Sequence, residues 1–591
     1  MTESREIAAE CADRAGSLFE LGKLAEAHAE VCRGLLVSPD DIPLLQLLVD
    51  IDDILNLTAE AVEACSRLAV LLPGNALLQV KIGQLWMKAF DHARAEAAFH
   101  EALAIDPRNP IAMDCLADLW RGGGKTGEAK SMLLRRASVS PDLESQAAYR
   151  FKTHLVQPVV ARDNAEIDAA RAEFAAALVS GPETQFLDPY KLGLGPNFYM
   201  GYQGRDDRPL QEALARYYLA ATPSLGATAP HIGQSSAERR IRVGIVCHYF
   251  SKHTVGYLTY GLAALLNRKR FELVLFRTPN SNRDGDTQRF AATATLIDLP
   301  PDLAGARQVI AQARLDVLHF PEIGMEPLVY FLAFARLATV QTVAWGHPIT
   351  TGIPNVDLFL SPDAMEPEGA EAHYSERLVR MRNLTFAGER PDAPQPFDLQ
   401  LDTTRPSYVC VQSLFKVHPD FDAVLAPILR RDPRGIIYFV TFLPHPDSIL
   451  KARFARSLGA DAARVRFLPR MTTGQFRHLA RSADVILDVP QWSGGKTSLD
   501  AFAMGTPVVH QPGAFMRGRH TLAFYRRMGL TAPIADTTEN YAELAVRVAN
   551  ERAFRDDVRA QIAANSNKLF NEAESIREIE EVWAAALRDR R

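Results

Sequence analysis

Residues 83–107 read GQLWMKAFDHARAEAAFHEALAIDP, and this stretch shows the pattern that repeats through the first quarter of the chain. Its last residue is one of four prolines spaced 34 residues apart, each with an alanine twelve residues before it. A period of this length with small residues at fixed positions predicts two antiparallel helices per repeat. Alanine lets the helices approach closely, and proline ends the second helix because it cannot continue one. The repeated positions are Pro39, Pro73, Pro107 and Pro141, preceded by Ala27, Ala61, Ala95 and Ala129.

The same stretch carries Gly83, Trp86, Phe99 and Ala102 at the offsets of a tetratricopeptide repeat. The alternative is an accidental proline spacing in a helical bundle, but two residue types share one period. Stacked repeats of this kind form a concave groove that binds peptides or partner proteins. We therefore expect about four tetratricopeptide repeats over residues 1–141, with a protein acceptor in their groove.

The charge balance of the chain bears on its partners. The 591 residues include 66 lysines and arginines against 71 aspartates and glutamates, so the formal net charge is −5. General affinity for nucleic acids requires a basic stripe that releases counterions, so we expect no nucleic-acid partner. The length exceeds what one hydrophobic core supports and predicts several domains.

Cysteine usage and hydropathy bear on the compartment. The six cysteines are scattered without a C-x-x-C pair, which argues against a zinc site or a disulfide framework. The first residues are polar and do not have the basic and apolar segments of a signal peptide. No run of about 18 apolar residues indicates a membrane span. We therefore expect a cytoplasmic protein with no membrane partner.

The remainder of the chain changes from helical to alternating patterns. Residues 142–238 read as a helical connecting region that ends in a linker rich in small and polar residues. Short β-branched runs then alternate with helices, which predicts parallel sheets with crossover helices. The pattern restarts once, so we expect two Rossmann-like lobes, the first over 239–395 and the second, together with closing helices, over 396–591. Ligands are expected beyond the carboxyl ends of the strands. The expected strands are 241–246, 271–276, 315–320, 340–344, 408–411, 436–440, 465–468, 485–487 and 507–510.

A glycine-rich loop follows one of these strands. Gly494 and Gly495 precede Lys496, Thr497 and Ser498, and a helix is expected to begin next to them. Glycines let the backbone approach a phosphate, the helix N-terminus offers free N–H groups, and the hydroxyls add donors. The alternative is a simple turn with a helix cap. A loop of this kind favours binding of a nucleotide phosphate without a metal.

Four short motifs follow one another in the second half of the chain. They are FSKHTVG at 250–256, WGHP at 345–348, VQSLFK at 411–416 and WSGGKTSLD at 492–500. Any one of them is weak alone, but the ordered set, which covers about residues 240–560, resembles the O-linked N-acetylglucosamine transferase/SPINDLY family, or glycosyltransferase family 41. The resemblance implies a GT-B domain that transfers sugar from a nucleotide-sugar to protein, so the expected fold is an α-helical repeat solenoid followed by an α/β GT-B domain.

The resemblance also implies roles for single residues. It places Lys416 at the nucleotide phosphates, where a cation stabilises the leaving group, and Asp500 at the donor ribose. A solvated surface lysine and a first-turn acid that complements the helix dipole are the plainer alternatives. His253 matches an active-site histidine that accepts the hydroxyl proton or hydrogen-bonds the donor. His319 and His347 follow strands of the same lobe and rank second.

The chain departs from the family where relatives contact the base and the phosphates. Ser413, with Gln412 beside it, stands where relatives carry a glutamine ahead of the lysine. Gly495 and Lys496 replace a histidine and a threonine of the phosphate loop. Phe476 stands in place of a histidine that stacks on the nucleobase, and phenylalanine also stacks. These changes leave the preferred nucleotide open.

Asp284 and Asp286 spell the D-x-D of metal-dependent transferases. They follow a loop-rich run, so we interpret them as part of a turn, and carboxylates elsewhere do not have metal-ligand spacing. We therefore expect no metal and no cofactor, with the nucleotide-sugar acting as substrate.

Lys496 suggests a hypothesis about the donor. A buried lysine requires a compensating negative charge, which the carboxylate of a CMP-linked nonulosonic acid such as pseudaminic acid would supply. The alternative is that Lys496 reaches solvent or pairs with a nearby acid, and that the donor is linked to UDP or GDP.

The expected function is transfer of a sugar to Ser/Thr hydroxyls of a protein held by the repeats. The segment 516–519 looks most like bacterial members of the family, some of which modify flagellin, so flagellin is the favoured acceptor. One alternative is a transferase that uses UDP-GlcNAc or GDP-fucose on other proteins. Others are a non-catalytic repeat scaffold with a degenerate transferase domain, and a different two-lobed enzyme such as an epimerase or phosphorylase.

Overall fold

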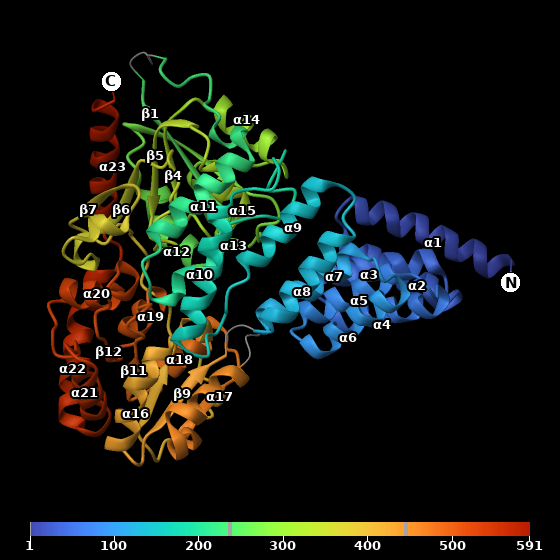
Figure 1. Ribbon diagram of the computed structural model, residues 1–591. Coiled ribbons are helices and arrows are strands. Elements are labelled where there is room, and N and C mark those ends of the chain that lie inside the picture. Colours follow the sequence, from blue (N-terminus) through green and yellow to red (C-terminus); the bar gives the residue numbers. More distant parts are fainter. Residues whose placement is uncertain (1, 235–238, 442–446, 591) are drawn as a thin grey trace. The chain divides into compact units, whose positions relative to one another are not determined.

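The computed structural model describes residues 2–234, 239–441 and 447–590 (Figure 1). The chain forms two compact units, residues 1–156 and residues 157–591. Among the described residues, no helix combines the length and apolar character that crossing a bilayer requires. The architecture confirms the expected helical repeat array and twin Rossmann-like lobes.

Antiparallel helices in pairs build the first unit. Its second helices begin at Leu24, Thr58, His92 and Thr126, and therefore keep the 34-residue period of the sequence. Each of these helices ends two or three residues before one of the repeated prolines. The helices are α1 (Thr2–Glu20), α2 (Leu24–Val37), α3 (Ile42–Leu55), α4 (Thr58–Leu71), α5 (Ala76–Lys88), α6 (His92–Ile105), α7 (Pro110–Gly122), α8 (Thr126–Ser138) and α9 (Leu143–Leu155).

The repeated alanines lie where the helices meet, since Ala27, Ala61, Ala95 and Ala129 are all fully buried. The first unit extends past residue 141, where the sequence pattern suggests its end. Helix α9 continues the stack, because its Tyr149 hydroxyl donates a 2.8 Å hydrogen bond to Asp114 of α7. The final helix lacks the repeated proline and was therefore not recognisable from the period.

The first lobe is built on a seven-stranded parallel sheet in the order β3-β2-β1-β4-β5-β6-β7. Val243 at its centre is in register with Leu273 on one side and with Val317 on the other. Three of its strands were not expected from the sequence, because they are short or lack a β-branched run. The strands are β1 (Ile241–Cys247), β2 (Phe271–Arg277), β3 (Thr295–Asp298), β4 (Leu315–Phe320), β5 (Ala338–Ala344), β6 (Leu358–Pro362) and β7 (Arg377–Met381).

The second lobe has a five-stranded parallel sheet in the order β10-β9-β8-β11-β12. In each sheet the first strand of the lobe pairs with strands on both sides, so the strand order reverses at β1/β4 and at β8/β11. Ligands of open α/β sheets bind beside the carboxyl ends of such strands. The strands are β8 (Ser407–Cys410), β9 (Ile436–Val440), β10 (Val465–Leu468), β11 (Val485–Leu487) and β12 (Val508–Val509).

Helices cover both faces of these sheets (Figure 1). In the first lobe they are α12 (Thr254–Leu265), α13 (Gly285–Thr293), α14 (Leu303–Gln312) and α15 (Pro327–Leu332). In the second they are α16 (Asp422–Arg431), α17 (Asp447–Ser457), α18 (Thr473–Ser482), α19 (Lys496–Ala503), α20 (His520–Met528), α21 (Thr538–Asn550) and α22 (Arg552–Asn565), together with the short 3-10 helix η5 (Leu414–Lys416).

The last helix, α23 (Ala573–Arg588), belongs to the core of the first lobe although it ends the chain. Ile576, Ile579 and Trp583 are buried there together with residues of β1 and β2. The expected division combined the second lobe and the closing helices in 396–591, and the structure places the last of these helices in the core of the first lobe. A sequence pattern shows that α23 is amphipathic, but it does not show which lobe receives the apolar face.

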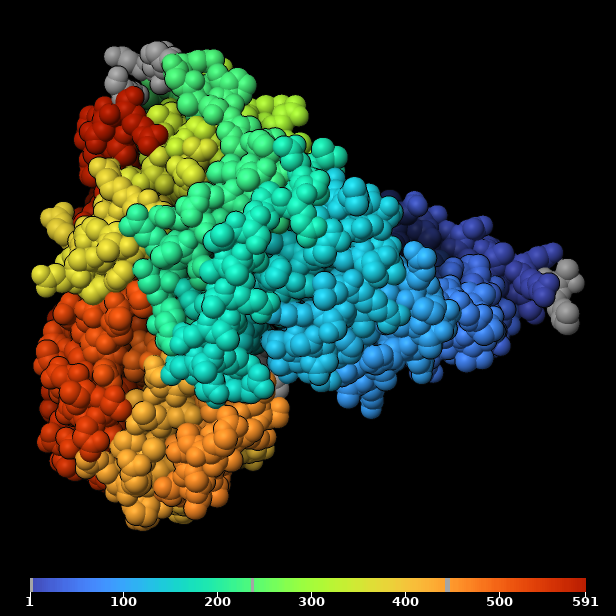
Figure 2. Space-filling view, viewed as in Figure 1, coloured from blue at the N-terminus to red at the C-terminus, as the bar shows by residue number. Residues whose placement is uncertain are grey.

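The connecting region of the second unit contains α10 (Asn164–Ser180), the 3-10 helix η1 (Phe198–Gln203) and α11 (Arg208–Ala221). It packs against both lobes: Tyr218 of α11 contacts the ring of Phe331 in the first lobe, and Asn164 hydrogen-bonds Asp420 of the second. In the space-filling view these teal and green residues lie across the lobes and reach the orange atoms of the second (Figure 2). Part of the expected linker, residues 235–238, lies outside the described residues.

Replacement of Trp583 by alanine should destabilise the second unit by about 3–5 kcal/mol, because it removes a fully buried indole and leaves a cavity. Denaturant unfolding followed by tryptophan-independent far-UV circular dichroism measures this loss. Arg577→Ala on the same helix is the matched control, because that side chain is 67% exposed and should change stability by less than about 0.5 kcal/mol. Equal stability of the two variants would contradict the placement of α23.

Candidate active site

A cleft of about 730 Å³ lies between the two lobes, at the carboxyl ends of the strands that flank the order reversals. Three of the predicted site residues line it: His253 from the first lobe, and Lys496 and Asp500 from the second. Its charged side chains balance, with five cations and five carboxylates. The charged residues are Lys252, Arg289, Arg390, Arg477 and Lys496, and Asp284, Asp286, Glu389, Asp392 and Asp500.

His253 caps helix α12, which begins where β1 leaves the sheet. Its Nδ1 accepts the backbone N–H of Val255 at 3.2 Å, and its ring stacks on Tyr249 with centroids 4.0 Å apart. Burial and then the neighbouring His248 lower the pKa of His253 to about 4, so the ring is neutral at neutral pH. Since Nδ1 accepts a hydrogen bond, the proton of the neutral ring is on Nε2. In this conformation His253 is a hydrogen-bond donor to a ligand rather than a base.

Lys496 finds its compensating charge within the chain. Its Nζ lies 2.6 Å from Oδ1 of Asp500, one helical turn later, and 4.7 Å from the centroid of the Tyr257 ring. Arg477 of α18 also contacts the Asp500 carboxylate, at 3.2 Å. The hypothesis that Lys496 requires an acidic sugar therefore loses its premise, and the alternative of pairing with a nearby acid describes the structure. Burial lowers the pKa of Lys496, and the attraction of Asp500 opposes that effect.

Lys416 lies in η5, directly beyond the carboxyl end of β8. Its Nζ is 5.6 Å from the ring centroid of Trp492 and 5.9 Å from that of Phe415. Burial lowers the pKa of Lys416 to about 8, although the charge of Asp488 raises it. The lysine is therefore not the solvated surface residue of the plainer alternative. It is charged at neutral pH and loses its charge as the pH rises through about 8.

The residues before Lys416 have different positions. Gln412 is buried, and its Nε2 donates to Oδ1 of Asp488 and to the carbonyl of Trp492, both at 3.3 Å. It therefore supports the loop and has little room to contact a base. Ser413 is partly buried, and its carbonyl accepts the N–H of Lys416 at 2.8 Å.

The buried carboxylate of Asp488 fixes the glycine-rich loop by hydrogen bonds. The carboxylate accepts the N–H of Gly494 at 2.7 Å and the hydroxyl of Ser493 at 2.7 Å. The Gly494 N–H is therefore not available to a phosphate. A Cβ at this glycine would lie 2.3 Å from the Ser498 hydroxyl, so a larger residue does not fit. The close packing around the Gly494 backbone therefore stabilises the loop and does not make room for a phosphate.

The groups of this loop that remain available to a ligand lie after Gly494, at the start of α19. Gly495 is the cap of α19 and has no side chain to satisfy the first helical N–H groups. The buried Thr497 hydroxyl oxygen has no hydrogen-bond partner among the described residues. Ser498, in contrast, is buried and hydrogen-bonds the Thr521 hydroxyl at 2.8 Å. The start of α19 can therefore bind an anion through Thr497 and its backbone.

Two of the predicted residues that do not line the cleft are buried in the core. Phe476 is 4% exposed, because its helix directs Thr473 and Arg477 to the cleft and the ring between them to the core. Its predicted stacking on a nucleobase is wrong for this conformation. His319 lies within β4 and is buried, with Nδ1 2.9 Å from the Thr342 hydroxyl, and burial lowers its pKa to about 3. It is a core residue.

The loop after β5 and the first residue of α20 bring His347 and His520 to the facing surfaces of the lobes. His347 is buried and stacks on Phe198, and His520 donates from Nδ1 to the carbonyl of Ser493 at 3.1 Å. The Nε2 atoms of both rings lack a hydrogen-bond partner within the described ranges. Burial lowers the pKa of His347 to about 3 and that of His520 to about 4.

Sequence reasoning missed Asp488 and His520. Asp488 directly follows the strand β11, and this position at the carboxyl end of a strand is the signal that could have identified it. Burial raises its pKa, but hydrogen bonds from His510 and Ser493 lower the pKa overall and keep the carboxylate ionised. His520 lies next to the noted segment 516–519, but only the fold brings it within 5.2 Å of the Trp345 ring.

His253 should stay neutral down to a pH of about 4, well below the ordinary histidine pKa of 6.5. Histidine-selective ¹⁵N NMR across pH 4 to 8 measures this, with the signal assigned by its absence in His253→Gln. His100 in the first unit stays in the same spectra as an internal reference. A midpoint for His253 near 6.5 would show that the ring is exposed and that the stacked arrangement does not persist.

Comparisons with known proteins show what the chain is similar to. Residues 399–579 match the family described as Glycosyl transferase family 41. The UDP-glucose:protein N-beta-glucosyltransferase of Actinobacillus pleuropneumoniae serotype 5b is 25% identical over 353 residues, which cover 58% of this chain and 55% of that protein. A probable UDP-N-acetylglucosamine--peptide N-acetylglucosaminyltransferase SEC of Arabidopsis thaliana is 24% identical over 53% of this chain and 33% of its own length.

A solved structure shares the fold. A mutant of the Thermobaculum terrenum O-GlcNAc transferase superposes with a TM-score of 0.69 at 21% identity, and the match covers 93% of this chain and 98% of that one. The chain spans about half the length, or less, of the curated relatives named above. The family match over the second lobe, the similar relatives and the shared fold agree with one another, and residues 399–579 of the chain are similar to glycosyl transferase family 41.

Proposed function

We propose that this chain transfers a sugar from a nucleotide-sugar donor to a side chain of a protein acceptor. The observation that carries the proposal is a cleft between two Rossmann-like lobes that is lined by His253, Lys496 and Asp500. Lys416 lies beyond the carboxyl end of β8, where it is attracted by Asp488, the residue that holds the glycine-rich loop. Donor cleavage leaves negative charge on the departing phosphate, and a cation with helix N–H groups stabilises that charge. A degenerate scaffold would not need to keep these groups, and an epimerase or phosphorylase would not need the repeat array.

Lys416, the start of α19 and His253 each have a separate task in this proposal. Lys416 supplies the positive charge to the leaving phosphate, and Thr497 with the first N–H groups of α19 supplies neutral donors. His253 donates a hydrogen bond from Nε2 to the donor, since its Nδ1 is already occupied. Asp500 is held by Lys496 and Arg477, which orients its carboxylate at the wall of the cleft, where a ribose hydroxyl could bind it.

We propose that the donor is a diphosphate sugar linked to UDP or GDP. The names of the similar proteins cite UDP-sugars, and Lys496 no longer calls for an acidic sugar. A CMP-linked nonulosonic acid is the rival. No divalent ion is required in this scheme, since the Asp284 carboxylate is occupied as the cap of α13 by the N–H groups of Lys252 and Thr287.

For the acceptor, we propose a protein bound by the repeat groove, with flagellin as the candidate to test and Ser/Thr hydroxyls as the modified groups. One similar protein is named as an N-glucosyltransferase, so an asparagine amide is the alternative acceptor group. We propose the cytoplasm as the compartment, because all six cysteines are free thiols, which persist in reducing surroundings.

Lys416→Ala should lower transfer of sugar to a co-expressed acceptor by about 100-fold or more, because it removes the charge that stabilises the leaving group. Intact-protein mass spectrometry of the acceptor reports both the extent of modification and the mass of the sugar. Lys568→Ala, at an exposed surface position, is the control and should transfer at the wild-type rate. Full transfer by a folded Lys416→Ala variant would refute the role of the lysine, and an unmodified acceptor with wild-type enzyme would favour the scaffold alternative.

Calorimetric titration with UDP, GDP and CMP should show the tightest binding for UDP or GDP, because a diphosphate places an additional charge near Lys416 and the start of α19. Binding should be unchanged in EDTA. Binding of CMP alone would restore the acidic-sugar donor, and binding that requires added Mg²⁺ or Mn²⁺ would return a metal role to Asp284 and Asp286. Thr497→Val should weaken whichever nucleotide binds.

A further inference from the structure

The connecting region sends one aromatic segment, residues 197–207, between the two lobes. We call this segment the strap. Tyr202 lies on the ring of Trp492 with centroids 3.9 Å apart, and on the ring of Phe415 at 4.7 Å. Phe198 stacks on His347 of the first lobe at 5.2 Å. The strap therefore contacts both lobes through the residues that surround the candidate active site.

The strap covers the two rings that flank Lys416. The Nζ of this lysine lies 5.6 Å from the Trp492 centroid and 5.9 Å from the Phe415 centroid. Tyr202 packs on both rings and is itself 8% exposed. Burial by such an apolar cover disfavours the charged form of a lysine. The cover comes from a segment more than 200 residues earlier in the chain.

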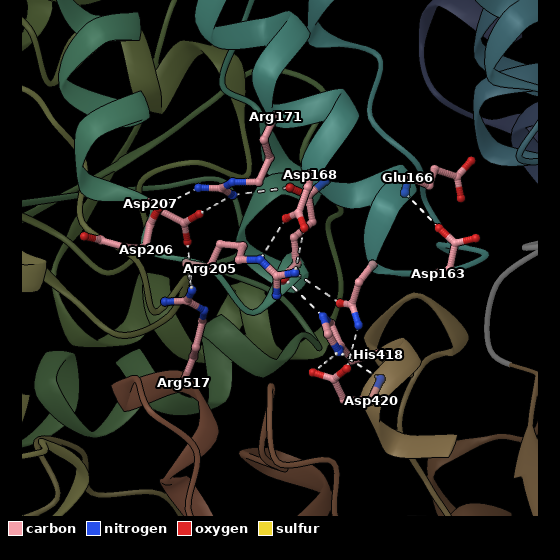
Figure 3. A network of polar contacts seen from close by, with 12 residues as sticks. Asp163, Glu166, Asp168, Arg171, Arg205, Asp206, Asp207, His418, Asp420 and Arg517 are labelled. Carbon is pink, nitrogen blue, oxygen red and sulfur yellow. Dashed lines mark hydrogen bonds and ion pairs between the residues drawn. The ribbon is translucent and has the colours of Figure 1, made fainter. Parts of the chain in front are cut away.

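Buried ion pairs anchor the strap (Figure 3). Asp207 at its end has a side chain only 2% exposed, and it pairs with Arg171 of α10 at 2.9 Å and with Arg517 of the second lobe at 3.0 Å. Arg517 also donates to the carbonyl of Arg205 at 2.6 Å. Removing one member of a buried ion pair leaves an uncompensated charge, which is strongly destabilising. The strap is therefore held in one position on the second lobe.

Two further contacts bring the backbone of the strap close to the second lobe. The carbonyl of Gln203 lies 3.1 Å from Nε2 of His418. Gly204 has φ +65°, and a Cβ there would lie 3.1 Å from Gln491 and 3.2 Å from His418. The left-handed backbone and the narrow space both require glycine. His418 follows η5 in the sequence, and Gln491 precedes the glycine-rich loop. The strap therefore contacts both loops of the second lobe that carry predicted ligand-binding residues.

The charged and titratable groups that face Lys416 are few. Asp488 attracts it from below the glycine-rich loop, and His347 and His520 lie near it as neutral rings. The carboxylate favours the charged lysine, whereas the aromatic cover disfavours it. Burial has a larger effect on the pKa of Lys416 than the attraction of Asp488, so removal of an apolar ring that helps to bury the lysine should raise that pKa.

We propose that the strap is a positioning element of the active site, in which Tyr202 keeps water away from Lys416 and holds its loop against Trp492. Tyr202 is a positioning residue, since it acts through the lysine and not on substrate. The presence of the Tyr202 ring should therefore affect the pKa of Lys416. With the cover in place the pKa of Lys416 is about 8, compared with an ordinary value of 10.5. Opening the cover should raise it toward that value, so the lysine would keep its charge to higher pH.

Competitive labelling with acetic anhydride at a series of pH values measures the pKa of each lysine in the full-length protein without any substrate. Wild type and Tyr202→Phe should show Lys416 with a midpoint near 8, because both keep the ring. Tyr202→Ala should raise the midpoint by about one unit or more. Lys568 in the same samples is the internal reference. The matched control in the strap is Arg205→Ala, which loses the partly exposed pair with Asp168 and a hydrogen bond to Asn164 but leaves the aromatic ring in place. An unchanged Lys416 midpoint in a folded Tyr202→Ala variant would overturn the proposal.

A second variant guards against a folding artefact. Asp207→Asn keeps the volume of the side chain but removes the charge that anchors the strap, and it should shift the Lys416 midpoint in the same direction as Tyr202→Ala. Hydrogen exchange of peptides covering 411–417 should increase in both variants and stay at the wild-type level in Tyr202→Phe and Arg205→Ala. A shift in all four variants would indicate general loosening and would refute a specific role for the ring.

The kinetic part of the inference rests on the proposed function. If the chain is a transferase, Tyr202→Ala should lower kcat at pH 7 by about tenfold and move the alkaline limb of the pH profile upward, with KM for the donor changed by less than threefold. Absence of transfer by the wild-type chain together with the labelling shift would refute the proposed function and leave the strap inference standing. A fall confined to donor KM, with the alkaline limb unmoved, would refute the positioning role.

Discussion

The buried carboxylate of Asp488 is the constraint on which the candidate site depends. It is 2% exposed, and it accepts hydrogen bonds from the Gly494 backbone, the Ser493 hydroxyl and the Gln412 amide, while His510 lies 2.8 Å away. A buried charge with fewer partners would be costly, so these groups must stay in place. As a result the loop after β8, which carries Lys416, and the loop after β11, which leads to α19, are fixed relative to each other before any ligand arrives.

The first lobe and the connecting region contribute further residues to the candidate site. His253 reaches the cleft as the cap of α12, and its orientation follows from a single backbone hydrogen bond. The strap adds an aromatic cover over Lys416 and is itself held by Asp207 between two arginines. Burial lowers the pKa of both His253 and Lys416, in accordance with the preference of active sites for perturbed pKa values.

For several residues, the position of the side chain in the structure decides between interpretations that the sequence motif left open. Lys496 suggested an acidic ligand, but Asp500 lies one helical turn away and neutralises it. Asp284 suggested a metal motif, but its carboxylate caps a helix. Phe476 and Arg477 are neighbours, and helix geometry places the arginine at the cleft and the phenylalanine in the core. In each case the decisive fact is the direction of a side chain, which a linear motif does not contain.

The sequence by itself determined the repeat array, the two α/β lobes and the order of the ligand loops, because helix period, strand composition and loop glycines are local properties. It also predicted Lys416 and His253 as site residues. Only the tertiary structure decided that α9 continues the repeats, that α23 packs in the first lobe, and that Asp488 and Tyr202 support Lys416. The physical reason is that burial and ion pairing join residues far apart in the chain, and the strength of these interactions depends on distances that only the folded chain defines.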